Sequence, residues 1–118
     1  MSQQNTEDVV QVPKPTQENV VNYKYEIVSN EKVCMVNDRY MVVKQLPVEV
    51  NGITYYGCCE NCVAKIQNNI GDVRYAKDPI TGDKVDKASA IIVQNKKDGV
   101  VYYFGTKDLA NKFIKEQG

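Results

Sequence analysis

Hydrophobic and polar residues alternate in two stretches of the chain, and a turn signal interrupts each of them. In "VEVNGITYY" the apolar positions recur at every second residue on both sides of Asn51-Gly52. A period of two is typical of a half-buried strand, and Asn-Gly favours a type I′ turn, because both central residues of that turn need positive φ. The stretch "AIIVQNKKDGVVYYF" has the same arrangement around Asp98-Gly99. The pattern therefore predicts two β-hairpins, over residues 48–56 and 91–104.

After each hairpin the apolar spacing changes to that of a helix. In "ENCVAKIQNNI" the first helix is expected to begin near Cys59 and to have Gly71 as its C-cap. In "KDLANKFIKEQG" the second helix is expected to follow Thr106, whose hydroxyl suits an N-cap. Each hairpin and its helix form a ββα unit that is too small to bury much apolar surface alone. The apolar residues that share a helix face are Val63, Ile66 and Ile70 in the first unit and Leu109 and Phe113 in the second.

The two ββα units align without a gap when one is shifted along the chain by 47 residues. Such self-similarity indicates an internal duplication and predicts that the units superpose. We therefore expect an α+β fold in which two tandem ββα units pack into one small domain. In each pair of adjacent tyrosines one side chain should face the core and the other the outside, because strand side chains alternate. The shift aligns Asn51 with Asp98, Gly52 with Gly99, Tyr55 with Tyr102, Tyr56 with Tyr103 and Lys65 with Lys112.

Charge and composition narrow the classes of function. The 15 lysines and arginines balance the 15 aspartates and glutamates, so no net charge directs the chain to nucleic acid or to an anionic membrane. No apolar run approaches the roughly 18–20 residues of a transmembrane segment. The chain has no histidine, which excludes Ser/His/Asp and Cys/His catalysis and removes the commonest neutral metal ligand. We therefore expect a protein that is not an enzyme, and any metal ion in it must be bound mainly by thiolates.

Three of the four cysteines lie within five residues, in "CCENC", and the fourth, Cys34, lies upstream. Cys58 and Cys62 are four residues apart at the expected helix start, where free N–H groups and the helix dipole favour thiolate over thiol. If the hairpin brings Cys34 beside them, the spacing C-x23-C-x3-C supplies three soft ligands. Three thiolates suit Zn²⁺ or Cu⁺ and are poor ligands for Mg²⁺ or Ca²⁺. The spacing therefore favours a metal site formed by these three cysteines.

Both units resemble a known family of metal-binding domains. A cysteine, then a hairpin that ends in two aromatic residues, then Cys-x3-Cys at a helix start is the pattern of "C…YYGCCENC". On this motif the chain resembles the TRASH/YHS group of small treble-clef-like domains, over roughly residues 31–116. The second unit is similar to the YHS pattern, but Thr81, Gly105 and Leu109 stand at its three cysteine positions. The matching residues of the second unit are Asp78, Pro79, Gly82, Val85, Tyr102, Tyr103, Phe104 and Phe113.

The resemblance implies a protein of heavy-metal trafficking, sensing or resistance, and it divides the chain into three parts. Residues 29–71 are the TRASH-like unit that carries the cysteines, and residues 72–118 are a degenerate YHS-like unit that serves as its packing partner. Residues 1–28 are polar at first and contain Pro13 and Pro15, which predicts a flexible leader whose end can add an edge strand. Such a leader suits a protein of the cell envelope or periplasm whose signal has been removed, a location we favour over the cytoplasm, although an oxidising compartment threatens free thiols.

Several readings of the site stay open. Cys59 is a fourth ligand, a redox partner or a bystander, and Cys59 with Cys62 forms a C-x-x-C pair like those of thiol–disulfide proteins. Alternatively, the metal ion only holds the fold of a structural interaction module. Met35 and Met41 offer thioethers to Cu⁺ but are more typical of core positions. Asp38 is an oxygen ligand or a solvated turn residue. A trafficking role further implies a partner protein that donates or accepts the metal.

Overall fold

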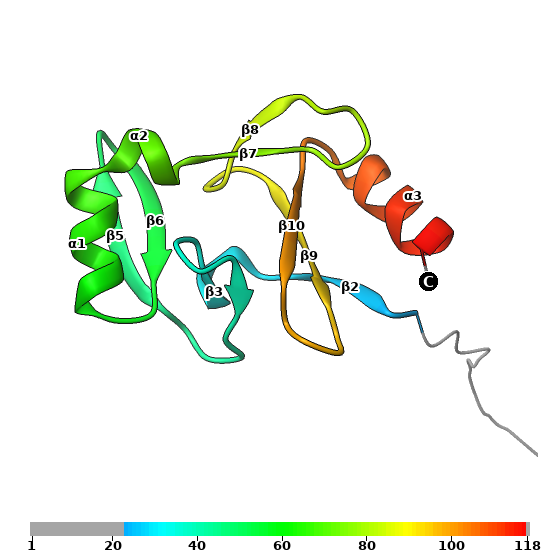
Figure 1. Ribbon diagram of the computed structural model, residues 1–118, viewed down its shortest axis with the longest axis horizontal. Helices are drawn as coiled ribbons and strands as arrows, with labels where there is room; N and C mark the ends of the chain where they lie inside the picture. The colour runs from blue at the N-terminus through cyan, green and yellow to red at the C-terminus, as the bar shows by residue number, and fades with distance from the viewer. Residues whose placement is uncertain (1–22, 118) are drawn as a thin grey trace, which may run out of the picture.

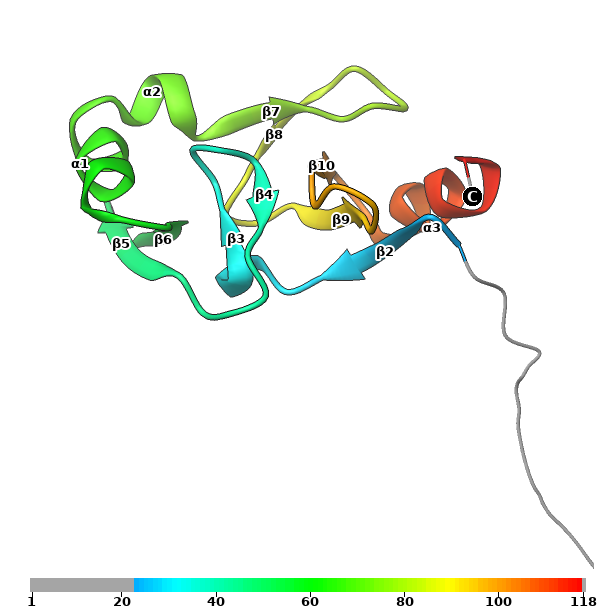
Figure 2. The ribbon, with the colours of Figure 1, turned by 60° about the horizontal axis from the view of Figure 1, so that its bottom comes forward.

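A computed structural model describes residues 23–117, which form a mixed α+β fold of several small sheets and three α-helices (Figure 1). The larger part of the expected leader, residues 1–22, lies outside this range. Helix α1 with the β5–β6 hairpin lies at one end of the molecule and α3 at the other, in both views (Figures 1 and 2). The strands are β2 (Tyr25–Val28), β3 (Val33–Cys34), β4 (Arg39–Tyr40), β5 (Leu46–Val50), β6 (Ile53–Gly57), β7 (Tyr75–Lys77), β8 (Lys84–Asp86), β9 (Ile91–Asn95) and β10 (Val101–Phe104). The helices are the 3₁₀-helix η1 (Asn30–Lys32), α1 (Glu60–Asn68), α2 (Ile70–Val73) and α3 (Lys107–Gln117).

Both predicted hairpins are present, but their turns differ. β5 and β6 pair antiparallel around Asn51 and Gly52, whose φ values of 52° and 80° are those of the expected type I′ turn. β9 and β10 also pair antiparallel, and β2 adds to the outer side of β9 as an edge strand. The second turn is longer, because the N–H of Asn95 donates to Val100 O at 2.9 Å and the four residues between them form the loop. The hairpin over residues 91–104 is therefore present as predicted, with a four-residue turn in place of the two-residue turn of the first hairpin.

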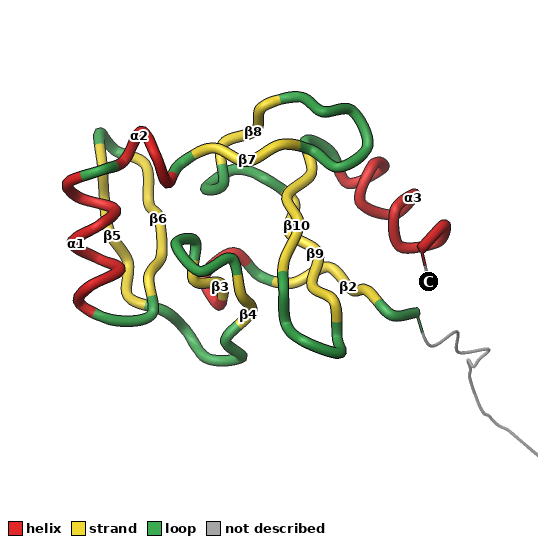
Figure 3. The backbone as a smooth tube through the Cα atoms, viewed as in Figure 1, coloured by secondary structure: helices red, strands yellow, loops and turns green. Residues whose placement is uncertain are grey.

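Each hairpin is followed by a helix, as Figure 3 shows for the whole chain. Cys59 is the N-cap residue of α1, and the Thr106 hydroxyl accepts a hydrogen bond from the Leu109 N–H at 3.2 Å as the predicted cap of α3. Gly71 is not a C-cap. The chain leaves helical geometry at Asn69 (φ −132°, ψ 44°) and then forms the short helix α2, which contains Gly71. The added turn buries Val73, which is 4% exposed, so packing extends the helical segment past the expected end.

The buried tyrosines do not follow the shift of 47 residues. Tyr55 and Tyr103 are 1% and 3% exposed and belong to one core cluster, whereas Tyr102 is half-buried against Phe113 of α3. The alignment of Tyr55 with Tyr102 is therefore wrong, although one tyrosine of each pair is buried as predicted. Tertiary packing decides which tyrosine of each pair is buried. The burial of a strand face depends on what packs against it, and the buried faces of β6 and β10 are those that contribute to the shared core.

The two hairpin regions share this core and exchange polar contacts across it. The Tyr55 hydroxyl donates to Asp86 Oδ2 at 2.9 Å, and the Tyr103 hydroxyl donates to Asp38 Oδ1 at 2.8 Å. Tyr55 and Tyr103 are 48 residues apart in the chain, and so are Asp38 and Asp86. The first hairpin thus bonds to the end of β8, and the second hairpin bonds to the turn between β3 and β4. The buried members of the core cluster are Val33, Met35, Val48, Tyr55, Ile66, Val73, Ala90, Ile92, Val101 and Tyr103.

Candidate metal centre

Cys34 ends the short strand β3 and lies in the turn that leads to β4. Its side chain is fully buried. The turn is closed by a hydrogen bond from the Asp38 N–H to the Cys34 carbonyl at 2.8 Å, and Asp38 has a φ of 56°, which aspartate tolerates better than most residues. The Met35 N–H donates to the Tyr56 carbonyl at 2.9 Å and ties this turn to β6. The first cysteine is thereby brought to the strand that leads into the other two.

Cys58 and Cys62 lie at the junction of β6 and α1. Gly57 ends the strand, and a Cβ atom placed on it would lie 2.9 Å from the Cβ of Cys62. Because real Cβ atoms do not approach so closely, a glycine is required for this packing of strand end against helix start. Four residues of helix then place Cys62 on the side of α1 that faces Cys58, as the sequence predicts. Cys62 is 7% exposed and Cys58 is half-buried.

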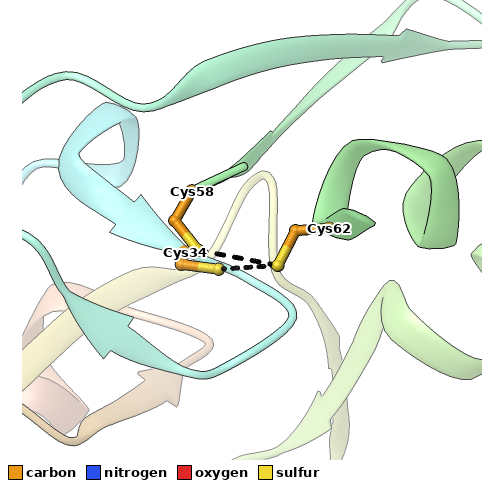
Figure 4. Close-up of side chains that lie close together, drawn as sticks. All are labelled: Cys34, Cys58 and Cys62. Carbon is orange, nitrogen blue, oxygen red and sulfur yellow. Dashed lines mark hydrogen bonds between the residues drawn. The ribbon is translucent and has the colours of Figure 1, made fainter. Parts of the chain in front are cut away.

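The sulfur atoms of Cys34, Cys58 and Cys62 converge (Figure 4) and lie within 4.8 Å of one another. The Sγ of Cys62 is 3.7 Å from that of Cys34 and 3.6 Å from that of Cys58, and all four cysteines are free thiols. Sulfurs that share one tetrahedral Zn²⁺ at about 2.3 Å lie roughly 3.8 Å apart. The three cysteines are therefore close enough to bind a single metal ion, and their donor set is soft.

The amide of Asn37 covers the same three-sulfur group, a contact that the sequence did not suggest. Its Nδ2 lies 3.5 Å from the Sγ of Cys58 and 3.8 Å from that of Cys62. N–H donors to a ligand atom orient it and stabilise its negative charge. Asparagine is not a typical ligand of soft metals, and the one available signal is its position three residues after Cys34, in the same turn. Asn37 thus contributes a side-chain N–H donor to the sulfurs of Cys58 and Cys62.

The protein distributes negative charge unevenly among the three thiols. Burial opposes ionisation of Cys34, but the backbone N–H groups of Asn37, Val36 and Cys58 outweigh it and lower the pKa of this thiol. Burial raises the pKa of Cys62, helped by Cys34 and opposed by a hydrogen bond with Cys58. Burial and the neighbouring sulfurs raise the pKa of Cys58 to about 12. A thiolate at Cys34 therefore makes the next two ionisations harder. A bound cation would supply the missing positive charge.

Cys59 differs from its neighbours in position. It is exposed at the N-cap of α1 and does not belong to the group of three converging sulfurs. The backbone N–H and side chain of Cys62 and the N–H of Asn61 lower the pKa of its thiol, although its sulfur makes no capping hydrogen bond. The thiol of Cys59 is thus accessible from solvent beside the site.

The other candidate ligands have different roles. Met35 is fully buried in the core cluster, and Met41 is 39% exposed. Asp38 is not simply solvated, because its Oδ1 accepts hydrogen bonds from Lys87 Nζ and from the Tyr103 hydroxyl, each at 2.8 Å. Among the cysteine, aspartate and glutamate side chains of the described part of the chain, the group that can hold a metal consists of the three cysteines and does not include Asp38.

In the second half of the chain a buried carboxylate links two separate segments. Asp78 is 2% exposed, and its Oδ1 accepts hydrogen bonds from the N–H groups of Ile80 and Thr81 at 2.8 and 3.2 Å. Its Oδ2 accepts the N–H of Gly105 at 2.9 Å. Asp78 thus ties the segment before β8 to the residue that follows β10. This unit is held without thiolates.

Comparisons with known proteins do not assign the chain to a family. No family model matches it, and no curated protein and no solved structure matches it significantly. Between residues 23 and 117, no helix is both long and apolar enough to cross a membrane.

Proposed function

We propose that this protein binds one soft metal ion, Cu⁺ or Zn²⁺, through Cys34, Cys58 and Cys62, and that it acts in metal trafficking, sensing or resistance. The observation that carries the proposal is the convergence of three sulfur atoms from two distant segments within 4.8 Å. Thiolates are the preferred ligands of Cu⁺ and are common ligands of Zn²⁺. The absence of histidine from the sequence leaves sulfur as the main soft donor. The motif resemblance to TRASH/YHS domains supports the same class of function.

Three protein ligands leave a further coordination position for exchange. A site with one position free can take a ligand from a donor or acceptor protein, which trafficking requires, whereas a fourth cysteine would close it as in structural zinc sites. Cys59 is exposed next to the three sulfurs and is the nearest thiol in sequence to serve as a transient ligand. The proposal therefore includes a partner protein that exchanges metal at this face.

Elemental analysis and a thiol count on the same reduced sample test the proposal. We expect one equivalent of Cu⁺ or Zn²⁺ per chain after loading and desalting, with three thiols protected from alkylation and one, Cys59, reactive. Binding releases protons, because the ligands must be thiolates. A protein that retains no metal under these conditions, with four reactive thiols, would contradict the proposal.

A thiol–disulfide protein is the second candidate, favoured by the short contacts of Cys62. Its sulfur lies 3.6 Å from Cys58 and 3.7 Å from Cys34, so oxidation would first join Cys62 to one of these. Reduction of a model disulfide at equal rates with and without metal would favour this candidate.

A further inference from the structure

Lys87 is a buried cation next to the turn that carries Cys34. The residue is 6% exposed, and its Nζ donates to the carbonyl of Met35 and to Asp38 Oδ1, each at 2.8 Å. A charged group that has lost its water is costly unless it is fully paired, so such contacts hold their partners firmly. Met35 directly follows Cys34, and Asp38 closes the same turn. Lys87 thus bonds both sides of the metal-binding turn.

Lys87 itself is fixed by the second half of the chain. Its backbone N–H donates to the Arg74 carbonyl at 2.8 Å. Tyr103 of β10 donates its hydroxyl to the same Asp38 oxygen, and the Lys87 ammonium lies 5.3 Å from the centre of the Tyr103 ring. Lys87 and Tyr103 therefore both form hydrogen bonds to the Cys34 turn, and neither belongs to the cysteine-bearing unit.

Cys58 and Cys62 are placed by β6 and α1, and within the described residues the hydrogen bonds of their sulfurs are with Cys34, with Asn37 and with each other. The three sulfurs converge only if the turn holds the Cys34 sulfur next to the sulfurs of Cys58 and Cys62 at the β6–α1 junction. On the side of the second half, the turn is also bonded through the backbone, by Val101 N–H to Asp38 O at 3.0 Å and Tyr40 N–H to Gly99 O at 2.8 Å. Lys87 contributes the side-chain contacts that are closest to the cysteine itself.

We infer that Lys87, with Tyr103, is a positioning residue for the metal site, so that the cysteine-free half of the protein sets the affinity of the cysteine-bearing half. This inference rests on the proposed function and adds a role for the second unit within it. Outer contacts that orient metal ligands change affinity by about 10- to 100-fold. Packing of the second half and metal binding are then linked, and each strengthens the other.

Two pairs of variants of the full chain test the inference: Lys87→Met with Arg74→Met, and Tyr103→Phe with Tyr55→Phe. The second member of each pair is the control, because Arg74 and Tyr55 make the equivalent contacts with Asp86. Arg74 Nη2 pairs with Asp86 Oδ2 at 2.8 Å, and among the described residues neither side chain has a hydrogen bond to the Cys34 turn. Lys87→Met is expected to weaken metal binding roughly tenfold or more in competition with a chromophoric chelator, and Tyr103→Phe severalfold. Arg74→Met and Tyr55→Phe should stay within about twofold of the parent protein.

A second readout separates the inference from the proposed function. In the metal-free protein, the rate at which Cys34 is alkylated, relative to Cys58, should rise in Lys87→Met and not in Arg74→Met. If the parent protein binds no metal, the proposed function fails, and a raised Cys34 reactivity still supports the positioning role. If the parent binds metal and Lys87→Met matches Arg74→Met in affinity and in Cys34 reactivity, the inference is overturned. If Lys87→Met does not fold, the comparison of Tyr103→Phe with Tyr55→Phe decides in the same way.

Discussion

At the scale of single residues, Gly57 is needed for the approach of Cys62 to the strand end. In Gly57→Ala the new methyl group would lie 2.9 Å from the Cβ of Cys62 and 3.3 Å from the backbone of α1, so the helix start must shift. We expect a loss of about 1–3 kcal/mol in the free energy of unfolding and a weaker metal site. The control is Gly71→Ala, since a Cβ there meets nothing within 4 Å. Chemical denaturation and chelator competition measure both effects, and equal behaviour of the two variants would refute the steric account.

Asn37 is expected to act on affinity with little effect on folding. Its side chain is exposed and its contacts are with the sulfurs of Cys58 and Cys62, so Asn37→Ala removes donors to the ligands and no core packing. We expect metal affinity to fall by roughly 10-fold or more, with an unfolding midpoint close to that of the parent. Asn68→Ala, an exposed asparagine at the end of α1, is the matched control. An affinity unchanged in Asn37→Ala would mean that the amide moves away when metal binds.

The sequence predicted the cysteines of the site but not the residues that support them. Cys58 and Cys62 could be placed together because a four-residue spacing at a helix start fixes their relation locally. Their closeness to Cys34 was expected from the hairpin and the family pattern. Asn37 and Lys87 act through contacts made only in the folded chain, over separations of 21 and 52 residues, and their residue types carry no signal of that role.

At the scale of elements, Asp78 joins the loop before β8 to the end of β10. Burial opposes its ionisation, but the N–H groups of Gly105, Ile80 and Thr81 lower the pKa of the carboxyl. A lowered folded-state pKa stabilises the protein above the unfolded pKa of about 4, and that stability is lost as the pH falls below it. We expect Asp78→Asn to cost about 2 kcal/mol at neutral pH, and the difference from the parent should shrink in acid.

Denaturant titrations from pH 7 to pH 3 check this prediction, with Asp83→Asn as the control in the same loop, where the carboxylate is exposed. Some acid sensitivity should remain in Asp78→Asn. Asp86 also has a lowered carboxyl pKa, because Arg74, the Ala88 N–H and the Tyr55 hydroxyl outweigh its burial. A cost of Asp78→Asn that stayed constant down to pH 3 would show that its charge does not matter.

The predicted elements were correct where local chemistry decides them. Asn51-Gly52 specifies its turn, because both residues adopt positive φ there, and Thr106 caps α3 through its own hydroxyl. The alignment of Tyr55 with Tyr102 was wrong, since which tyrosine of the second pair is buried depends on how the β9–β10 hairpin packs in the whole molecule. That the two ββα units are tandem repeats that superpose remains a prediction.

At the scale of the whole molecule, the shared apolar core should keep the protein folded when metal is removed. Its members are buried by one another, and the second unit is tied by Asp78 instead of by thiolates. We expect a chelator to lower the melting temperature of the loaded protein without unfolding it at 25 °C. A metal concentration 100 times the dissociation constant adds about 2.7 kcal/mol, which the chelator removes. Complete unfolding on chelation, followed by circular dichroism, would instead indicate a structural interaction module whose fold depends on the metal.

The most direct test of a three-cysteine metal site is a metal titration of Cys34→Ser beside Cys59→Ser. Cys34 belongs to the converging sulfurs and not to the C-x-x-C pair, whereas Cys59 belongs to that pair and lies outside the group. The account predicts that Cys34→Ser loses most of its affinity for Zn²⁺ and Cu⁺ and that Cys59→Ser binds nearly as the parent does. Unchanged metal binding in Cys34→Ser, together with reduction of a model disulfide that depends on Cys59, would contradict it.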